Sequence, residues 1–226
     1  LYDTRRKLFH IGEDVEKGRL SASYYDLLAS ESRILVFTAM RMGQIPPESW
    51  RKMGRPTSGG ALLSWSGTMF EYLMPDLLMR SMPHTLLGET DRKVVRAQMQ
   101  YGAARKRPWG VSESGYCAFD MHLNYQYRAF GMREMSMGGV VSREVVAPYA
   151  GCLALQVFPR QAAKNLEAMA EMGWKGECGL YEAVDYARIQ PRIVKSWMSH
   201  HQGMSLCAIC NALKNDALVQ YYMNAP

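Results

Sequence analysis

The sequence predicts a mainly α-helical protein, and three observations support this prediction. Apolar residues recur at helical spacing in several long segments. The alternation of strands and helices that marks a parallel sheet is absent. The segments between the helices are long and rich in aromatic residues, Gly and Ser. The expected helices make up about half of an α/α toroid, in which inner and outer helices alternate around a central pocket. We therefore expect an incomplete toroid with a short N-terminal β-hairpin.

The first element is expected to be that hairpin, or an extended entry, over residues 1–22. Residues 7–12 have the composition of a short strand, and residues 16–19 that of a turn. Ser23 is a candidate N-cap for a helix that runs to about Gly43, with apolar residues at helical spacing.

The middle of the chain alternates between loops and helices. Residues 54–67 are rich in Gly, Ser and Pro and predict a loop. A helix is expected over 68–79 with a kink at Pro75, and a longer one over about 86–105. Residues 106–143 form the longest irregular region. A loop of that length in a compact domain usually has a function.

Three further helices are expected in the C-terminal part, over about 144–156, 159–172 and 192–213. The second has Pro in its first turn and Gly at its end. A Gly-rich segment over 173–186 separates the last two. Because no linker divides the chain, we expect residues 1–226 to form a single domain.

Composition excludes several protein classes. With 226 residues, of which 48% are hydrophobic, the chain is long and apolar enough to bury a core. It contains no run of the roughly 18 to 20 uncharged apolar residues that span a membrane. The N-terminus has no initiator Met and no signal-peptide pattern. We expect a piece of a longer protein that is itself free of membrane spans.

Charge and cysteine content point to an intracellular protein that does not bind nucleic acid. The net charge is +6, but the basic residues form short clusters separated by mixed-sign segments rather than a stripe. Five cysteines provide no disulfide framework, and the C-x-x-C of Cys207 and Cys210 lacks a second pair for zinc. The sulfur-rich composition is typical of a reducing cytoplasm.

Acidic residues lie in loops that are crowded with Trp, Tyr, Gly and Ser. The clearest examples are the segments 63–72, 108–116, 124–127 and 179–186. Sugars present apolar faces and a rim of hydroxyls, so aromatic platforms beside carboxylates are typical of sugar sites. Glycosidic cleavage also needs two carboxyl groups, one of them with a pKa raised by burial. Glu113 and Glu182 are the best candidates for that pair.

Seven segments of the sequence resemble the glucoamylase-like domain of the cyclic β-1,2-glucan synthases. This domain is also similar to bacterial endo-β-1,2-glucanases. The matching segments follow in order along nearly the whole chain: 24–31, 64–72, 108–116, 124–131, 146–150, 181–186 and 200–204. The resemblance implies an (α/α)6-toroid glycosidase fold. It implies either transglycosylation that cyclises β-1,2-glucan or hydrolysis within the glucan chain.

The same resemblance implies partners, location and catalytic residues. Essential acids of these enzymes lie in the loops that match 112–114 and 181–183, which again selects Glu113 and Glu182. The expected partners are a β-glucan and the rest of a larger synthase at the cytoplasmic side of the inner membrane, with neither cofactor nor metal. The chain lacks N-terminal helices of the family, and its loop at 187–191 is short. It could therefore associate with itself, or bind or scaffold glucan without catalysis.

For the two glutamates we expect different roles, with Glu182 as general acid and Glu113 as nucleophile or base. The structural alternatives are a salt bridge for Glu182 and a helix cap for Glu113. Glu71 is expected to be a buried or bridging helix residue. Asp26 and Glu31 fall near the start of the first expected helix, where the helix dipole favours carboxylates.

The remaining candidates would bind the sugar. Trp65, Trp109, Tyr125 and Tyr127 are stacking candidates, each with core packing as an alternative. The amide of Gln126 can donate to and accept from neighbouring hydroxyls. Asp185 either orients Glu182, binds a hydroxyl or caps a helix. His201 and Gln202 are expected to contact sugar hydroxyls rather than a metal.

Overall fold

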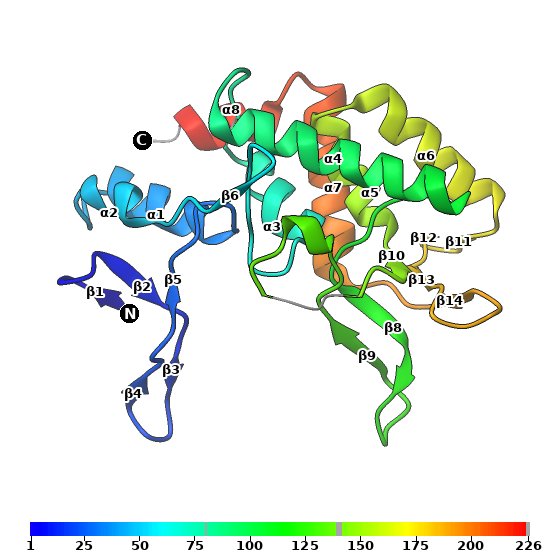
Figure 1. Cartoon of the computed structure of the whole chain (residues 1–226), viewed down its shortest axis with the longest axis horizontal. Helices are drawn as coiled ribbons and strands as arrows, with labels where there is room; N and C mark the ends of the chain where they lie inside the picture. The colour runs from blue at the N-terminus through cyan, green and yellow to red at the C-terminus, as the bar shows by residue number, and fades with distance from the viewer. Residues whose placement is uncertain (80, 139–141, 225–226) are drawn as a thin grey trace.

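The computed structural model describes residues 1–79, 81–138 and 142–224. Helices dominate, and four of them, α4 to α7, lie side by side in the body of the molecule (Figure 1). The α-helices are α1 Ser32–Arg41, α2 Glu48–Lys52, α3 Met69–Leu73, α4 Leu86–Arg105, α5 Pro148–Leu153, α6 Pro159–Glu171, α7 Ser199–Leu213 and α8 Ala217–Asn224. Three single turns of 3-10 helix are η1 Pro75–Leu77, η2 Arg133–Met135 and η3 Ala154–Gln156.

The strands are short and antiparallel. Those of the N-terminal third are β1 Tyr2–Asp3, β2 Leu8–His10, β3 Glu13–Asp14, β4 Arg19–Leu20, β5 Tyr24–Tyr25, β6 Thr57–Ser58 and β7 Ala61–Leu62. Those that follow are β8 Ser114–Phe119, β9 Tyr125–Arg128, β10 Val145–Val146, β11 Lys175–Gly176, β12 Gly179–Leu180, β13 Ala183–Asp185 and β14 Arg192–Val194. The prediction of a mainly α protein is confirmed at the level of a helix-rich fold.

The N-terminal strands confirm the expected hairpin and correct the helix after it. β1 pairs with β2, and the expected turn at 16–19 overlaps the connection between β3 and β4. The helix expected from Ser23 begins only at Ser32. Tyr24 and Tyr25 instead pair with β2. A strand partner within reach outweighs the weak helical preference of this segment.

The core centres on α5, whose six residues are all buried. α5 packs against α3, α6 and α7. A Cβ at Gly151 would lie 3.1 Å from Leu166 of α6, so glycine allows this close packing of the two helices. A helix that is buried all round is expected at the centre of a helical bundle.

Two expected helices are confirmed and two are shortened. α4 has the predicted bounds, and α6 ends within one residue of its predicted end. The helix expected over 144–156 begins as the strand β10, and the helix expected over 192–213 begins as β14. Both strands flank β13 in a three-stranded sheet, whose pairing overrides the local pattern.

The region expected to be irregular, 106–143, contains the two-stranded hairpin β8–β9. It projects from the helical body in Figure 1. Its outer end exposes the apolar side chains of Phe119, Met121 and Leu123. The loop at 54–67 likewise contains the short pair β6–β7, and the C-terminal helix α8 was not predicted.

Candidate functional site

The loop before β8 is held by the side chains of neighbouring helices. Asn165 of α6 accepts from the backbone N–H of Trp109 at 3.0 Å and donates to its carbonyl at 2.8 Å. Gln98 of α4 does the same at Val111, at 2.9 and 2.8 Å. These buried amides satisfy backbone groups that a strand partner would otherwise bind. They fix the path of the chain that leads to Glu113.

Tyr149 of α5 completes this support. Its hydroxyl donates to the carbonyl of Glu113 at 2.9 Å and lies 2.8 Å from the hydroxyl of Ser112. Ser112 in turn accepts from the N–H of Phe70 in α3. The backbone at Glu113 is therefore fixed from two helices. None of these supporting residues was predicted, because their partners are distant in sequence.

The side chain of Glu113 is half-buried and accepts a hydrogen bond of 2.7 Å from the hydroxyl of Tyr127 in β9. Burial raises the pKa of Tyr127, and its hydrogen bond to Glu113 raises it further. Tyr127 therefore stays protonated and acts as a donor to the Glu113 carboxylate. The two candidates, which were predicted separately, lie together.

Glu31 is a second carboxyl group that interacts electrostatically with Glu113. It occupies the N-cap position of α1 but makes no side-chain capping bond. Burial raises its pKa, and the negative charges of Glu71 and Glu113 raise it further. This direction is opposite to the one expected from the helix dipole, so burial and like charge dominate at Glu31. The electrostatic coupling to Glu113 is a signal that only the fold reveals.

Glu182 lies deeper than expected for a general acid. Its side chain is 1% exposed. One carboxylate oxygen accepts from the N–H of Gly115 at 3.1 Å, and both lie within 3.0 Å of Nδ1 of His201. The direct catalytic role expected of Glu182 stays a prediction; in this structure its carboxylate is enclosed by protein groups.

His201 is equally enclosed. Its ring stacks on that of Tyr149, with centroids 3.8 Å apart and planes 12° apart. Its Nε2 atom lies 3.4 Å from the hydroxyl of Tyr127. The expected contact of His201 with a sugar hydroxyl is wrong for this geometry, because the ring is fully buried. Gln202 is half-buried, and its amide donates to the carbonyl of Leu180 at 3.5 Å.

The two tryptophan candidates separate. Trp109 is 8% exposed and belongs to the core, so the expected stacking role of Trp109 is wrong and its core-packing alternative holds. Trp65 is 44% exposed. Its backbone carbonyl accepts from Ser136 and from Gly138, which fixes the position of the residue while the indole remains available.

The hairpin β8–β9 offers a further aromatic surface. Tyr125 packs on Phe119 with ring centroids 4.8 Å apart, and its hydroxyl accepts from the N–H of Lys195 at 3.3 Å. A cavity of about 340 Å³ lies along this face between Tyr127 and Lys195. Gln126, between these two tyrosines in β9, is half-buried, and its side chain does not line this cavity. This groove provides the aromatic faces and polar groups that a sugar chain requires.

Asp185 and Glu71 are structural in this fold. Asp185 is buried, and its carboxylate accepts from the N–H of Cys117 and of Ala187, which ties β8 to β13. The expected sugar contact of Asp185 is therefore wrong. Glu71 forms a capping box with Thr68 at the start of α3, as its expected helix role implied.

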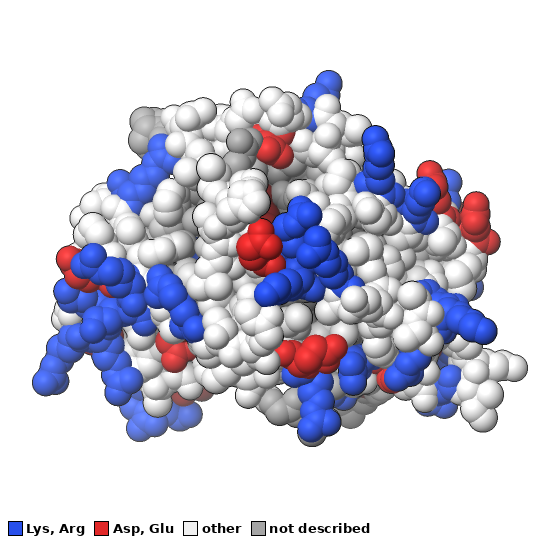
Figure 2. All heavy atoms as spheres, turned by 45° about the horizontal axis from the view of Figure 1, so that its top comes forward, with Lys and Arg blue, Asp and Glu red and all other residues white. Residues whose placement is uncertain are grey.

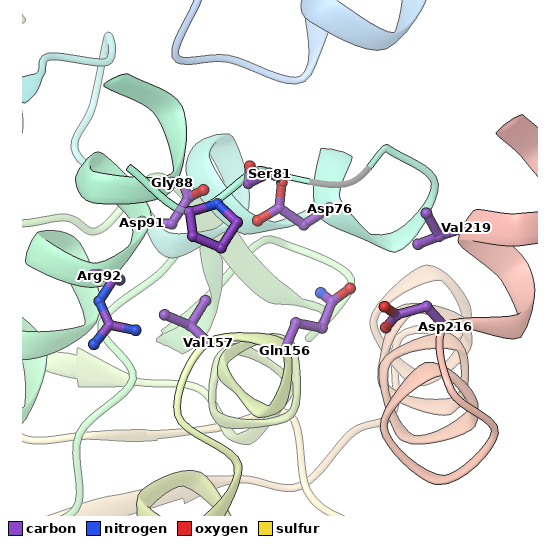
Figure 3. A pocket seen from close by; sticks show the side chains of 10 residues that line it. Asp76, Ser81, Gly88, Asp91, Arg92, Gln156, Val157, Asp216 and Val219 are labelled. Carbon is purple, nitrogen blue, oxygen red and sulfur yellow. Dashed lines mark hydrogen bonds between the residues drawn. The ribbon is translucent and has the colours of Figure 1, made fainter. Parts of the chain in front are cut away.

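A second cavity of about 160 Å³ lies near the C-terminal end of α7, whereas His201 is in the first turn of that helix. Figure 3 shows Asp76 and Ser81 on one side of this cavity and Gln156 and Asp216 on the other. Asp91, which also lines it, is 2% exposed, and neither carboxylate oxygen has a hydrogen-bond partner. Burial raises the pKa of Asp91 well above its ordinary value, and the charge of Asp76 adds to this.

The part of the chain that the structure describes lacks both a metal-binding cluster and a membrane-spanning helix. No group of three or more His, Cys, Asp or Glu is arranged to hold a metal ion there. No helix among those residues is both long and apolar enough to cross a bilayer. Lys and Arg on the face shown in Figure 2 are scattered and interspersed with acidic residues.

Comparisons with known proteins place the chain in a family. Residues 23–226 match the family described as "Putative glucoamylase". The chain belongs to this glucoamylase-like family. Over its full length it is also 38% identical to the cyclic β-(1,2)-glucan synthase NdvB of Rhizobium meliloti (strain 1021), of which it spans only 8%.

Solved structures show the same fold. A "putative glucoamylase" from Bacteroides fragilis superposes with a TM-score of 0.68 at 16% identity, covering 97% of this chain and 56% of that one. An endo-β-1,2-glucanase from Chitinophaga pinensis, in complex with sophorotriose and glucose, superposes with a TM-score of 0.62 at 14% identity. The superposed region covers 97% of this glucoamylase-like chain and 57% of the glucanase. The chain thus corresponds to somewhat more than half of each solved relative.

Proposed function

We propose that this glucoamylase-like chain cleaves and transfers the glycosidic bonds of β-1,2-linked glucan, with Glu113 as a reacting carboxylate. The observation that carries the proposal is the position of Glu113. It is fixed by its backbone and by Tyr127, beside the aromatic groove of the β8–β9 hairpin. The synthase and the glucanase among the relatives both act on β-1,2-glucan by name, which supports this substrate.

The second reacting carboxyl is proposed to be Glu31 instead of Glu182. A general acid in a glycosidase must keep its proton near neutral pH. The pKa of Glu31 is raised, first by burial and then by the charges of Glu71 and Glu113, which is the direction that a general acid requires. Glu113 accepts a hydrogen bond from the Tyr127 hydroxyl at 2.7 Å, which holds its carboxyl group in place for the role of nucleophile or base. Glu113 thus keeps its expected role as nucleophile or base, and the proposed general acid changes from Glu182 to Glu31.

The proposal extends to architecture. We propose that residues 1–226 form one domain whose helices are part of an (α/α)6 toroid, completed by other segments of a larger synthase polypeptide. The solved relatives, which are nearly twice as long, support this. The cytoplasmic location, the absence of nucleic-acid binding, a catalytic mechanism without metal or cofactor, and self-association stay predictions.

The test is incubation of the chain with linear β-1,2-glucan, followed by mass spectrometry of the products. Cyclic or longer products indicate transfer, and short linear products indicate hydrolysis. Glu113→Gln and Glu31→Gln should each abolish product while glucan binding persists. The control is Glu134→Gln, because Glu134 is exposed and its carboxylate pairs with Arg143. Product formation by Glu113→Gln would overturn the proposal.

The alternative function is binding or scaffolding of glucan without catalysis. It is favoured by the relatives' greater length, since the missing part could contribute to the catalytic cleft. Glucan binding by the wild-type chain with no product would support it. The same glutamate variants in the full-length synthase would then show whether Glu113 acts once the toroid is complete.

A further inference from the structure

A continuous line of polar contacts joins the buried Glu182 to Glu113. Glu182 holds Nδ1 of His201 at 2.9 Å. On the other side of the ring, Nε2 lies 3.4 Å from the hydroxyl of Tyr127. That hydroxyl donates to Glu113 at 2.7 Å. The line runs from Glu182, just before β13, through α7 to β9, and of its four residues Tyr127 lines the groove.

The chemistry of the buried end fixes the tautomer of the histidine. A carboxylate can only accept hydrogen bonds, so the hydrogen on His201 must lie on Nδ1 to pair with Glu182. In the neutral ring Nε2 is then an acceptor that faces Tyr127. Tyr127 has a single hydrogen, and the shorter distance shows that Glu113 receives it.

This arrangement gives the hydroxyl of Tyr127 two possible acceptors. While Glu113 is ionised, its carboxylate is the stronger acceptor and the hydroxyl donates to it. If Glu113 takes up a proton, the hydroxyl can turn to Nε2 of His201 instead. The network thus accommodates both protonation states of Glu113 without a buried group that loses its partner.

The histidine cannot easily leave this position. Its ring stacks on Tyr149, and the same tyrosine donates to the carbonyl of Glu113. The ring of His200 lies 4.0 Å away, between centroids, on the remaining side. The titratable groups around His201 are therefore Glu182, Tyr127, Tyr149 and His200, with Glu113 one contact further.

We propose that Glu182, His201 and Tyr127 form a positioning network that orients the Glu113 carboxylate for the reaction proposed above and responds to its protonation. The inference rests on that proposed function for its kinetic consequence, but its geometry does not. A buried Glu182–His201 pair that merely joined α7 to the strands would explain the 2.9 Å contact. It would not explain why Nε2 faces the one hydroxyl that binds Glu113.

Two variants test the two ends of the network. Tyr127→Phe removes the donor to Glu113 and should lower kcat about 10-fold or more with a smaller change in KM, as expected for loss of a hydrogen bond to a charged group. In Glu182→Gln the amide oxygen keeps the bond from the N–H of Gly115, and the amide N–H takes the place of the other oxygen, 3.0 Å from Nδ1, which favours the hydrogen of His201 on Nε2. Because Nε2 then donates to the Tyr127 hydroxyl instead of competing for its hydrogen, the bond from Tyr127 to ionised Glu113 becomes stronger. The acidic limb of the pH–rate profile should therefore move to lower pH, with a smaller loss of kcat than in Tyr127→Phe.

The double variant separates positioning from mere stability. In a network, Tyr127→Phe/Glu182→Gln should lose no more activity than Tyr127→Phe alone, because the signal from Glu182 passes through Tyr127. Ser205→Ala is the matched control, since its hydroxyl bonds the backbone carbonyl of His201 and leaves the ring contacts intact. Additive losses with an unchanged pH–rate profile would overturn the proposal.

A spectroscopic readout keeps this test independent of turnover. The ring nitrogens of His201, observed by ¹⁵N NMR of the whole chain, should show hydrogen on Nδ1 in the wild type and on Nε2 in Glu182→Gln. Tyr127→Phe should shift the Nε2 resonance only. A wild-type ring with hydrogen on Nε2 would refute the network, whatever the enzyme does. Failure of the proposed function itself would instead appear as undiminished activity of Glu113→Gln.

Discussion

Asn165 of α6 binds both backbone groups of Trp109, through hydrogen bonds of 3.0 and 2.8 Å. A side-chain amide thereby replaces the strand partner that this segment lacks. The residues that follow lead directly to Glu113, so the position of the candidate catalytic carboxylate depends on a helix 56 residues away in sequence.

Asn165→Leu is therefore expected to destabilise the protein and to impair the site. The substitution leaves a buried N–H and a buried carbonyl of Trp109 without partners, at a cost of about 1 to 3 kcal/mol for each group. Urea unfolding should show the loss, and the remaining folded protein should have a lowered kcat. An exposed change on the same helix, Lys164→Leu, should do neither. Unchanged stability of Asn165→Leu would contradict the structural role.

The two tryptophans should respond in opposite ways. Trp65→Ala removes an exposed ring and should weaken glucan binding by roughly 5- to 10-fold, about the value of one aromatic contact, with little change in Tm. Trp109→Ala empties a core site and should cost about 3 to 5 kcal/mol of stability. Calorimetric glucan titration and thermal unfolding measure the two effects. Equal glucan affinity of Trp65→Ala and the wild type would remove Trp65 from the site.

Glu71→Ala should destabilise the start of α3. The carboxylate accepts from the N–H groups of Ser66 and Thr68 and from the hydroxyl of Ser64. Loss of a cap and of these bonds is expected to cost about 2 kcal/mol or more. Thermal unfolding checks the value. Glu71→Gln, which can still accept through one oxygen, should lose less; an equal loss would indicate that only the negative charge matters.

Asp91 should make stability depend on pH in a definite direction. Its pKa in the folded state lies well above the ordinary 3.8, because it is buried next to Asp76. Between the pKa of Asp91 in the unfolded chain and its higher pKa in the folded protein, the folded protein therefore binds more protons than the unfolded chain. Its contribution to stability is complete below about pH 3.8 and is lost as the pH rises through the folded pKa.

Asp91→Asn removes this loss, so the variant should be more stable than the wild type at neutral pH, by about 1 kcal/mol or more, and similar to it in acid. Thermal unfolding between pH 4 and pH 8 measures the difference. Asp14→Asn is the opposite control. Asp14 is exposed, and its bonds to Lys17 lower its pKa. Asp14 therefore causes no loss of stability as the pH rises. A variant of Asp91 that was less stable at every pH would contradict the assignment.

Some elements could be predicted because their signals are local. α4 and α6 were placed within a residue, since each has apolar residues at helical spacing and clear end signals. The strands β5, β10 and β14 could not be predicted, because each exists only through pairing with a distant strand. The β8–β9 hairpin lacks the two-residue turn that marks most hairpins in a sequence.

The candidate residues divide in the same way. Tyr125 and Tyr127 line the aromatic groove, Glu113 is hydrogen-bonded to Tyr127, and Trp65 is exposed. A role of these residues in sugar binding stays a prediction. Glu182, His201 and Asp185 were candidates as well, and they are buried and bonded to protein groups. Composition identifies polar residues in apolar surroundings, but it does not show whether a side chain faces solvent or another side chain.

The sequence by itself determined the helical class, the family and the loop that contains Glu113, because these depend on local periodicity and on ordered motifs. Only the tertiary structure decided which carboxyl groups interact electrostatically and which are buried. Burial and charge are properties of the packed chain, and they bring Glu31 into electrostatic contact with Glu113 while they enclose Glu182 against His201. Such contacts join residues tens of positions apart, so no local pattern records them.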